Sequence, residues 1–303
     1  MAIKIAFTNY KGGTAKTTSS TNLAGGLLKT FPDAKILLVE ADGQGNTSST
    51  FSIKSSTIEN TMYDVMLKDV PMKDIVINAY ENIDIAPANS DMDFVDFDFM
   101  TENKREMKVS IFQALKKIPN LVKRILTMKL SEFLTEIDKE IVETKDYFNL
   151  LKDKLDDVDG IYDFIIFDTP PEMKAVTAST LAVVDHVIIP YEPEKYSVEG
   201  IVRLLRRINT IRNEYNPSLN IAGLLPVKVN MKTKLHNEVM ASILQFSMNQ
   251  KINHFSTRIP ASIRFATATA NGLPATIVDK RTEKFTEAYY ELIDELIEKE
   301  IIK

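Results

Sequence analysis

A glycine-containing turn between a strand-like and a helix-like segment most constrains how this chain can fold. Residues 3–7 alternate apolar and other side chains, which predicts a strand, and residues 17–30 carry leucines at helical spacing. The turn between them, residues 9–18, reads Asn-Tyr-Lys-Gly-Gly-Thr-Ala-Lys-Thr-Thr. Glycines let backbone N–H groups converge on an anion, and the start of a helix adds its dipole. Together the three segments predict a phosphate-binding loop.

The rest of the chain continues the same alternation of strands and helices. An apolar run at 35–40 follows the first helix and completes a βαβ unit, which favours a parallel sheet. We therefore predict an α/β fold with a doubly wound, mostly parallel sheet, in one domain spanning 1–303. Further strands are predicted at 83–86, 164–167, 187–189 and 221–225, and further helices at 198–213, 234–246 and 282–303.

One long segment departs from this rhythm. No comparable strand lies between residues 88 and 162, and apolar residues recur there every three or four positions, from Ile111 to Ile125 and from Leu130 to Val142. This predicts a helical insertion at about 97–159, since ordinary connections are much shorter. Eight basic residues and one acid occupy 104–129. The insertion is either a set of solvated helices or a surface for a dimer, DNA or a partner protein.

Composition excludes several classes of protein. The chain has no cysteine, so disulfides, thiolate zinc sites and cysteine-ligated iron–sulfur clusters are excluded, and three histidines argue against a histidine-rich metal site. A net charge of −5 excludes a uniformly basic nucleic-acid coat protein but permits a local basic patch. No apolar run approaches the roughly 20 residues of a membrane helix, and the first residues lack the shape of a secretion signal. We expect a cytoplasmic protein with no membrane partner.

The phosphate loop departs from the strict Walker A pattern, because Tyr10 and Ala15 replace its two glycines. It matches the deviant form K-G-G-x-x-K-T, whose extra lysine is Lys11. Over 3–51 and 162–300 the chain resembles the ParA/Soj group of deviant-Walker P-loop ATPases, which also contains MinD. If position 15 needs a positive φ, alanine costs on the order of 1 kcal/mol there.

This resemblance implies ATP and Mg²⁺ as cofactors. Lys16 would reach the β- and γ-phosphates, and the Thr17 hydroxyl would ligate Mg²⁺ directly. Lys11 would reach across an ATP-bound sandwich dimer to the partner's phosphates and act there like a trans-acting arginine. The ATP-binding residues implied in the loop are Lys11, Gly12, Gly13, Thr14, Ala15, Lys16, Thr17 and Thr18.

Two aspartates complete the catalytic set that the resemblance implies. The strand at 35–40 leads into Glu-Ala-Asp-Gly-Gln-Gly-Asn, where Asp42 aligns with the aspartate that positions the attacking water. Asp168 directly follows the predicted strand at 164–167, at the sheet edge where ligands of open α/β sheets bind. Both aspartates would reach Mg²⁺ through water, so the predicted catalytic residues are Lys11, Lys16 and Asp42.

The later motifs of the family imply contacts to the base and to DNA. Asn230 and Pro260 fall where relatives border the adenine, although a plain loop asparagine is the alternative for Asn230. Arg264 aligns with an arginine implicated in non-specific DNA binding, and its alternative is a surface salt bridge. DNA contacts of this kind would neutralise phosphates without reading bases. The predicted DNA-binding residues are Arg264, Arg258, Lys234 and Lys232.

The resemblance thus predicts an ATPase for plasmid or chromosome partition. Its ATP-bound homodimer would bind non-specific DNA on the nucleoid, and a ParB-like centromere-binding protein would stimulate an otherwise slow hydrolysis. The alternative is an ATPase of the MinD/ParA group that positions proteins without DNA as a track. Cycling on a membrane would need a basic amphipathic helix, whereas the segment 291–300 is amphipathic but acidic.

Overall fold

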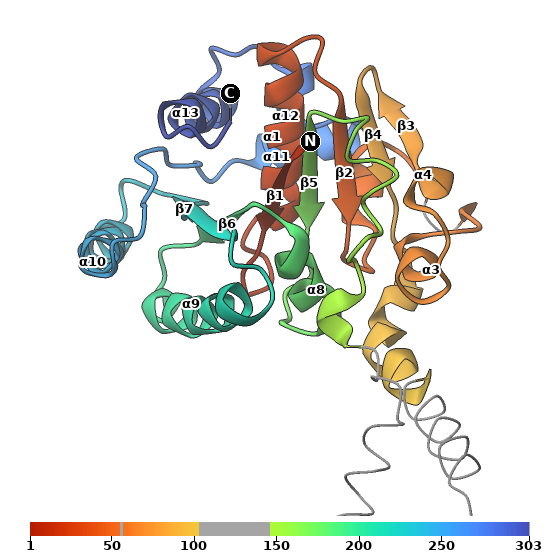
Figure 1. Ribbon diagram of the computed structural model, residues 1–303. Coiled ribbons are helices and arrows are strands. Elements are labelled where there is room, and N and C mark those ends of the chain that lie inside the picture. Colours follow the sequence, from red (N-terminus) through yellow and green to blue (C-terminus); the bar gives the residue numbers. More distant parts are fainter. Residues whose placement is uncertain (55–56, 103–145, 303) are drawn as a thin grey trace, which may run out of the picture.

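The computed structural model describes residues 1–54, 57–102 and 146–302, and these form a seven-stranded sheet in the order β3-β4-β2-β5-β1-β6-β7 (Figure 1). All neighbouring strands are parallel except β3, which runs antiparallel to β4 at one edge. The strands are β1 (Ile3–Phe7), β2 (Ile36–Glu40), β3 (Ile77–Tyr80), β4 (Ile83–Ala86), β5 (Phe164–Asp168), β6 (His186–Tyr191) and β7 (Asn220–Pro226).

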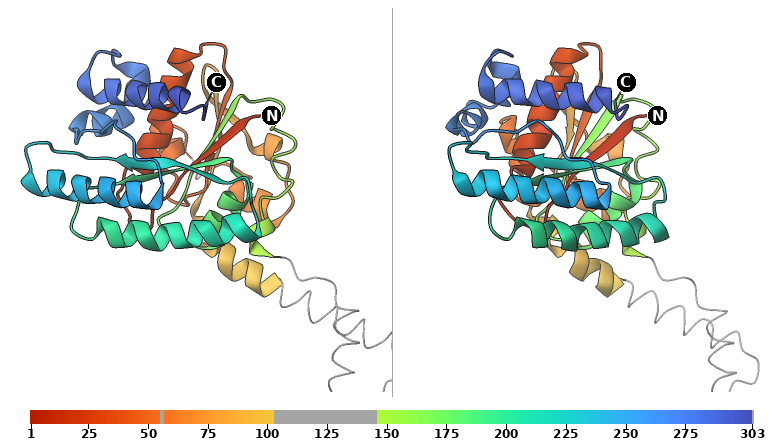
Figure 2. Two further views of the ribbon diagram at one scale, coloured as in Figure 1. Left: turned by 60° about the vertical axis from the view of Figure 1, so that its left-hand side comes forward. Right: turned by 90° about the vertical axis from the view of Figure 1, so that its left-hand side faces the viewer.

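Helices cover both faces of this sheet, and α13 lies beside α1 on one face while α8 and α9 lie on the other (Figure 2). The chain returns from α1 to β2 on the far side of β5, which gives the doubly wound order. The helices are α1 (Lys16–Thr30), α2 (Asn46–Thr50), α3 (Met62–Leu67), α4 (Met72–Ile75), α8 (Ala175–Val183), α9 (Ser197–Glu214), α10 (Lys234–Gln250), α11 (Ile263–Ala270), α12 (Ala275–Val278) and α13 (Lys284–Glu298), with short 3-10 helices η2 (Ser90–Phe94) and η3 (Tyr147–Asn149).

The central strands are buried on both sides, which explains their continuous apolar runs. Successive side chains of a strand point to opposite faces. Ala6 and Phe167 accordingly join the core under α8 and α9, whereas Ile5 and Ile166 join the core under α1 and α13. Two apolar cores thus hold the sheet rigidly, and its carboxyl edge carries the loops that form the site.

The observed architecture confirms the predicted doubly wound α/β fold. Edge strand β3 was not expected, because its four residues, Ile-Asn-Ala-Tyr, give too short a pattern to identify a strand. The terminal helix occupies Lys284–Glu298 rather than all of 282–303. Within the described residues no helix is long and apolar enough to cross a membrane.

The expected insertion is described only at its two ends. Residues 95–102 are helical, and residues 150–161 form successive turns whose apolar side chains, such as Leu151 and Val158, are buried against the sheet. The two apolar periodicities and the basic run at 104–129 lie outside the described residues. A helical insertion at 97–159 within one domain stays a prediction.

Candidate nucleotide site

The loop predicted from the sequence lies at the carboxyl end of β1 and is held by contacts to its neighbours. The side-chain amide of Asn9 donates to the carbonyl of Pro190 at 2.6 Å, and its oxygen accepts the N–H of Lys11 at 3.0 Å. The Thr14 hydroxyl donates to the carbonyl of Lys11 at 3.1 Å. These bonds fix the conformation of the turn between β1 and α1.

Ala15 caps α1 with a left-handed backbone, φ 55° and ψ 31°. Position 15 thus has the positive φ that the sequence analysis considered. A non-glycine residue occupies a position that favours glycine, at a cost of about 1 kcal/mol. Gly13 also has a positive φ, 75°, at the other side of the turn. The loop therefore keeps the shape of a phosphate loop with only one of its two left-handed positions filled by glycine.

Lys16 is the buried cation of the loop. Its side chain is 7% exposed, and its Nζ lies 3.3 Å from the carbonyl oxygen of Asn9 and 3.5 Å from that of Lys11. Burial lowers the pKa of Lys16, and the charges of Asp168 and Asp42 oppose this shift. An ammonium group held by two carbonyls inside a glycine turn is suited to contact a polyphosphate.

Asp168 lies between the ends of β1 and β2, because its Cα is the register partner of Phe7 on one side and of Glu40 on the other. Its Oδ2 accepts the hydroxyls of Thr17 at 2.6 Å and Thr47 at 2.9 Å. Burial raises the pKa of Asp168 to about 7, although both hydroxyl bonds oppose the shift. Its Oδ1 is buried and has no hydrogen-bond partner among the described residues.

Glu40 is an organising residue to which sequence reasoning gave no role. It is fully buried, and its carboxylate accepts the N–H groups of Thr47 at 2.6 Å, Ser48 at 3.1 Å and Ala88 at 3.1 Å, and the Ser48 hydroxyl at 2.6 Å. Burial raises the pKa of Glu40 in spite of these four bonds. The carboxylate fixes α2 and so positions Thr47 on Asp168. The signal available in the sequence for a structural role of Glu40 was an acidic residue at the end of a strand expected to be buried.

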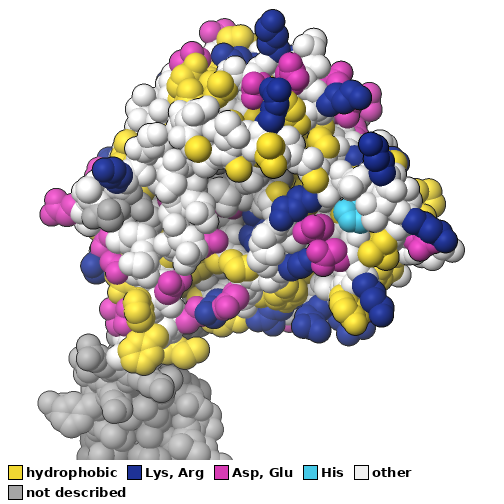
Figure 3. Space-filling model, turned by 180° about the vertical axis from the view of Figure 1, so that it is seen from behind, with side chains coloured by type: hydrophobic (Ala, Val, Ile, Leu, Met, Phe, Trp, Pro, Cys, Tyr) yellow, Lys and Arg dark blue, Asp and Glu magenta, His cyan; other side chains and the backbone are white. Residues whose placement is uncertain are grey.

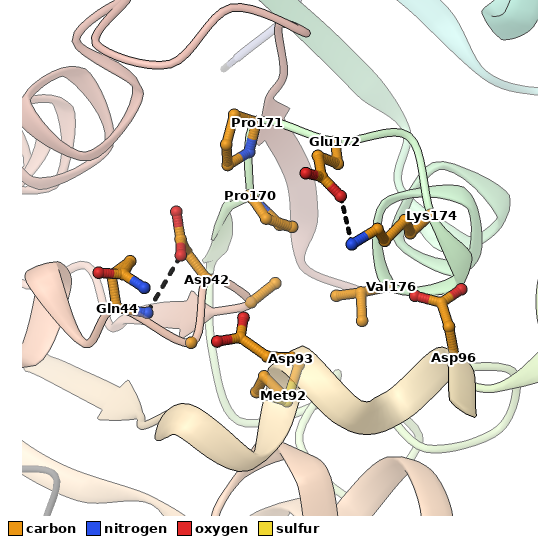
Figure 4. A pocket seen from close by; sticks show the side chains of 12 residues that line it. Asp42, Gln44, Met92, Asp93, Asp96, Pro170, Pro171, Glu172, Lys174 and Val176 are labelled. Carbon is orange, nitrogen blue, oxygen red and sulfur yellow. Dashed lines mark hydrogen bonds and ion pairs between the residues drawn. The ribbon is translucent and has the colours of Figure 1, made fainter. Parts of the chain in front are cut away.

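Asp42 lies where two cavities meet. It lines the cavity of about 410 Å³ at the phosphate loop, together with Lys16 and Thr17. It also lines a cavity of about 280 Å³, where Asp93 faces it from η2 and Pro170 lies on the wall formed by the loop after β5 (Figure 4). The N–H of Gln44 donates to its Oδ1 at 3.1 Å. A carboxylate here can contact a water beside a ligand that occupies the phosphate-loop cavity.

Lys11 points away from its own loop. Its Nζ lies 2.6 Å from Oε2 of Glu194 and 4.0 Å from Oε2 of Glu192, both on the loop after β6. The side chains of Lys11 and Glu194 are 47% and 50% exposed. Lys11 lines a third cavity, of about 180 Å³, with these two acids. It is accessible from outside.

The two residues expected near the adenine lie on adjacent segments. Val229 pairs with Pro260 in a parallel bridge, and the N–H of Val229 donates to the carbonyl of Ile259 at 3.0 Å. Asn230 accepts the N–H of Lys232 through its own side chain at 3.1 Å, a local turn contact. Within the described chain, the lining of the phosphate-loop cavity includes neither Asn230 nor Pro260 but does include Lys228 and Thr269.

The four residues expected to bind DNA fall into two places. Arg258 donates to the sulfur of Met231 at 3.3 Å, so it lies beside the turn that holds Lys232 and leads into α10 at Lys234. Arg264 lies elsewhere: it is 4.0 Å from Asp279 and stacks over Phe285 at 5.4 Å. Figure 3 shows Lys and Arg side chains concentrated on one half of the rear face, interspersed with acids.

The fold and this loop define a P-loop nucleotide-binding protein with a second, outward-facing lysine. A family model described as an AAA domain matches residues 2–126 and 126–221. A ParA family protein of Mycoplasma pneumoniae is 30% identical over 309 residues, covering 97% of this chain and 96% of that protein. The sporulation initiation inhibitor protein Soj of Bacillus subtilis is 28% identical over 293 residues, covering 96% and 97%. The chain belongs to the ParA family of P-loop partition ATPases.

A solved structure of an enzyme shares the fold. Cobyrinic acid a,c-diamide synthase from Mycobacterium smegmatis, with a bound ATP analogue and magnesium, superposes with a TM-score of 0.73 at 21% identity, covering 98% of this chain and 94% of that one. Such a likeness shows the fold alone. The function of this chain must therefore be inferred from its own site and its sequence relatives.

Proposed function

We propose that this chain is an ATPase that partitions plasmid or chromosomal DNA. The observation that carries the proposal is that Lys16 and Thr17 line one cavity at the carboxyl edge of the sheet, with Asp168 accepting the Thr17 hydroxyl at 2.6 Å. Relatives named ParA and Soj match nearly the whole chain, which supports partition rather than another use of the fold.

Magnesium-bound ATP fits this cavity by chemistry. Asp168 Oδ1 is a buried oxygen without a partner among the described residues, and the Thr17 hydroxyl is bonded to the other oxygen of the same carboxylate. Oxygen donors of this kind suit Mg²⁺. Thr17 would hold the ion directly, and Asp42 and Asp168 would hold it through water. When bound, the ion neutralises phosphate charge, while Lys16 contacts the β- and γ-phosphates.

The remaining loop residues divide between binding and catalysis. The backbone N–H groups from Gly12 to Thr18 would surround the phosphates, with Asn230 and Pro260 bordering the base. Asp42 would orient the attacking water. Lys11 would leave Glu194 and contact the phosphates of the second subunit in an ATP-bound homodimer. Hydrolysis would be slow until a ParB-like partner binds.

The dimer would bind non-specific duplex DNA on the nucleoid through Arg264, Arg258, Lys234 and Lys232. We would measure binding with ATP, ADP or no nucleotide at two salt concentrations. ATP-dependent binding that weakens steeply with salt is expected, because each lysine or arginine releases counterions from phosphates. Arg258→Ala should reduce the salt slope by about one. Arg281→Ala, which removes an exposed arginine paired with Asp294, is the matched control.

Absence of DNA binding in every nucleotide state would reject DNA as the track. An ATPase that positions proteins would then be the better description. Lys11 and Asp42 would keep their roles in that case, since dimerisation and hydrolysis do not depend on the track. Loss of binding in Arg258→Ala but not in Arg264→Ala would confine the DNA surface to the turn beside α10.

A further inference from the structure

A third lysine lines the phosphate-loop cavity, and the sequence motifs gave it no role. Lys228 lies two residues beyond the end of β7, at the carboxyl edge of the sheet where ligands of such folds bind. It lines the same cavity as Gly13 and Lys16. Its side chain is 44% exposed, so it is accessible to a ligand as well as to the loop.

The side chain of Lys228 is directed at the loop. Its Nζ lies 3.8 Å from the position that a Cβ on Gly13 would take. A side chain at position 13 would be strained in any case, because φ there is 75°. At 3.8 Å the ammonium group of Lys228 lies in van der Waals range of this point, directly over the loop backbone.

The backbone holds Lys228 in this direction. Its φ is 53°, a left-handed conformation that is uncommon for lysine. Both neighbours are fixed by hydrogen bonds: the N–H of Val227 donates to the carbonyl of Tyr191 at 2.9 Å, and that of Val229 to Ile259 at 3.0 Å. Such a conformation persists where the surroundings enforce it, and these positions cluster at functional sites.

Glu192, the acid paired with Lys228, leaves the ammonium group of Lys228 free to bind a ligand. Oε2 of Glu192 is 3.8 Å from Lys228 Nζ and 4.0 Å from Lys11 Nζ, so one carboxylate lies between two lysines. A separation of 3.8 Å is longer than a hydrogen bond. A polyphosphate in the cavity would offer closer, charge-assisted bonds than this carboxylate does.

We propose that Lys228 is a further nucleotide-binding residue, which contacts the phosphate chain of the nucleotide held by the loop. This inference rests on the proposed binding of ATP in this cavity. Lys16 contacts the phosphates from inside the loop, whereas Lys228 approaches from the end of β7. On binding, its ammonium group moves from Glu192 to a phosphate oxygen.

The test is Lys228→Met, which keeps an unbranched stem and removes the charge. Affinity for a fluorescent ATP analogue with Mg²⁺ would be measured by titration without DNA. We expect at least a tenfold loss of affinity and a weaker dependence on salt. Lys228→Arg, which retains the charge, should stay within about threefold of the wild type.

Lys251→Met is the matched control, because Lys251 is also an exposed lysine with a left-handed backbone, φ 55°, at the end of α10. It should bind the analogue as the wild type does. Equal affinity of Lys228→Met and Lys251→Met would overturn the assignment while leaving the proposed function intact. Equal losses in Lys228→Met and Lys228→Arg would also overturn it, since the charge would then not matter. A wild-type chain that binds no analogue would reject the proposed function itself.

Discussion

Lys11 is paired with Glu194 of its own chain, at 2.6 Å between Nζ and Oε2. The ammonium group lowers the pKa of Glu194. Because both side chains are about half exposed, water screens the pair and it stabilises the fold little. The pair therefore holds Lys11 on its own chain and costs little to break, so it would not keep Lys11 from the second subunit of the proposed dimer.

Glu194→Gln should make ATP-dependent dimerisation easier by removing the partner that competes for Lys11. We expect the ATP concentration at half-maximal dimer to fall by a few fold, measured by analytical ultracentrifugation. Asp294→Asn, which breaks an equally exposed ion pair with Arg281 on α13, is the control and should have no effect. Weaker dimerisation in Glu194→Gln would show that this acid supports the dimer instead.

Asp42→Ala should separate binding from hydrolysis. Loss of a residue that orients water typically costs about a hundredfold or more in rate, whereas the phosphate contacts of the loop remain. Phosphate release should fall by that factor, and affinity for ATP should stay within about threefold. Asp33→Ala, at an exposed turn after α1, should hydrolyse normally. If Asp42→Ala instead lost ATP binding, its role would lie in holding the nucleotide.

Ala15→Gly should stabilise the loop or leave it unchanged, unlike most substitutions of alanine by glycine. Glycine removes the strain of φ 55° but adds freedom to the unfolded chain, so we expect a change of about 0 to +1 kcal/mol in the free energy of unfolding. Ala241→Gly, at an exposed position inside α10, should lower it by about 1 kcal/mol. Urea unfolding of both variants measures this free energy. An equal loss in Ala15→Gly and Ala241→Gly would show that the backbone of Ala15 is not strained.

Asp159→Asn should make stability depend less on pH. Asp159 Oδ1 accepts the N–H of Ala2 at 3.0 Å and lies 2.7 Å from Lys4 Nζ. Burial opposes its ionisation, but the bond to Lys4 and further contacts prevail and lower the pKa of Asp159. A group with a lowered folded pKa stabilises the protein above its unfolded pKa, about 3.9, and that contribution is lost as pH falls through the folded value.

The variant should therefore lose about 1–2 kcal/mol at pH 7, and the difference from the wild type should shrink as pH falls below 4. Urea unfolding at pH 7, 5 and 3 would measure this. Asp33→Asn is the control for a solvent-exposed carboxylate. A difference that stays constant with pH would mean that the variant perturbs packing and not charge.

The sequence alone determined the positions of the main strands along the chain, the phosphate loop and the place of Asp168 at the end of β5. Each of these depends on local signals: apolar periodicity, glycines at a turn and a polar residue directly after a buried strand. The family resemblance added roles for Lys11 and Asp42. The four residues of β3 are too few to show an apolar periodicity. This edge strand forms because it pairs with β4, and a local pattern does not reveal that pairing.

Only the tertiary structure decided which side chains of the site contact one another. Glu40 reaches Ala88 and α2, Asp168 joins Thr17 to Thr47, and Lys228 arrives over Gly13 from a strand more than 200 positions away. Apart from the contact between Glu40 and α2, these contacts join residues that are distant in the chain, and spacing in the sequence carries no information about them. They arise because parallel strands end at one edge of the sheet, which gathers the loops of separate segments around one cavity.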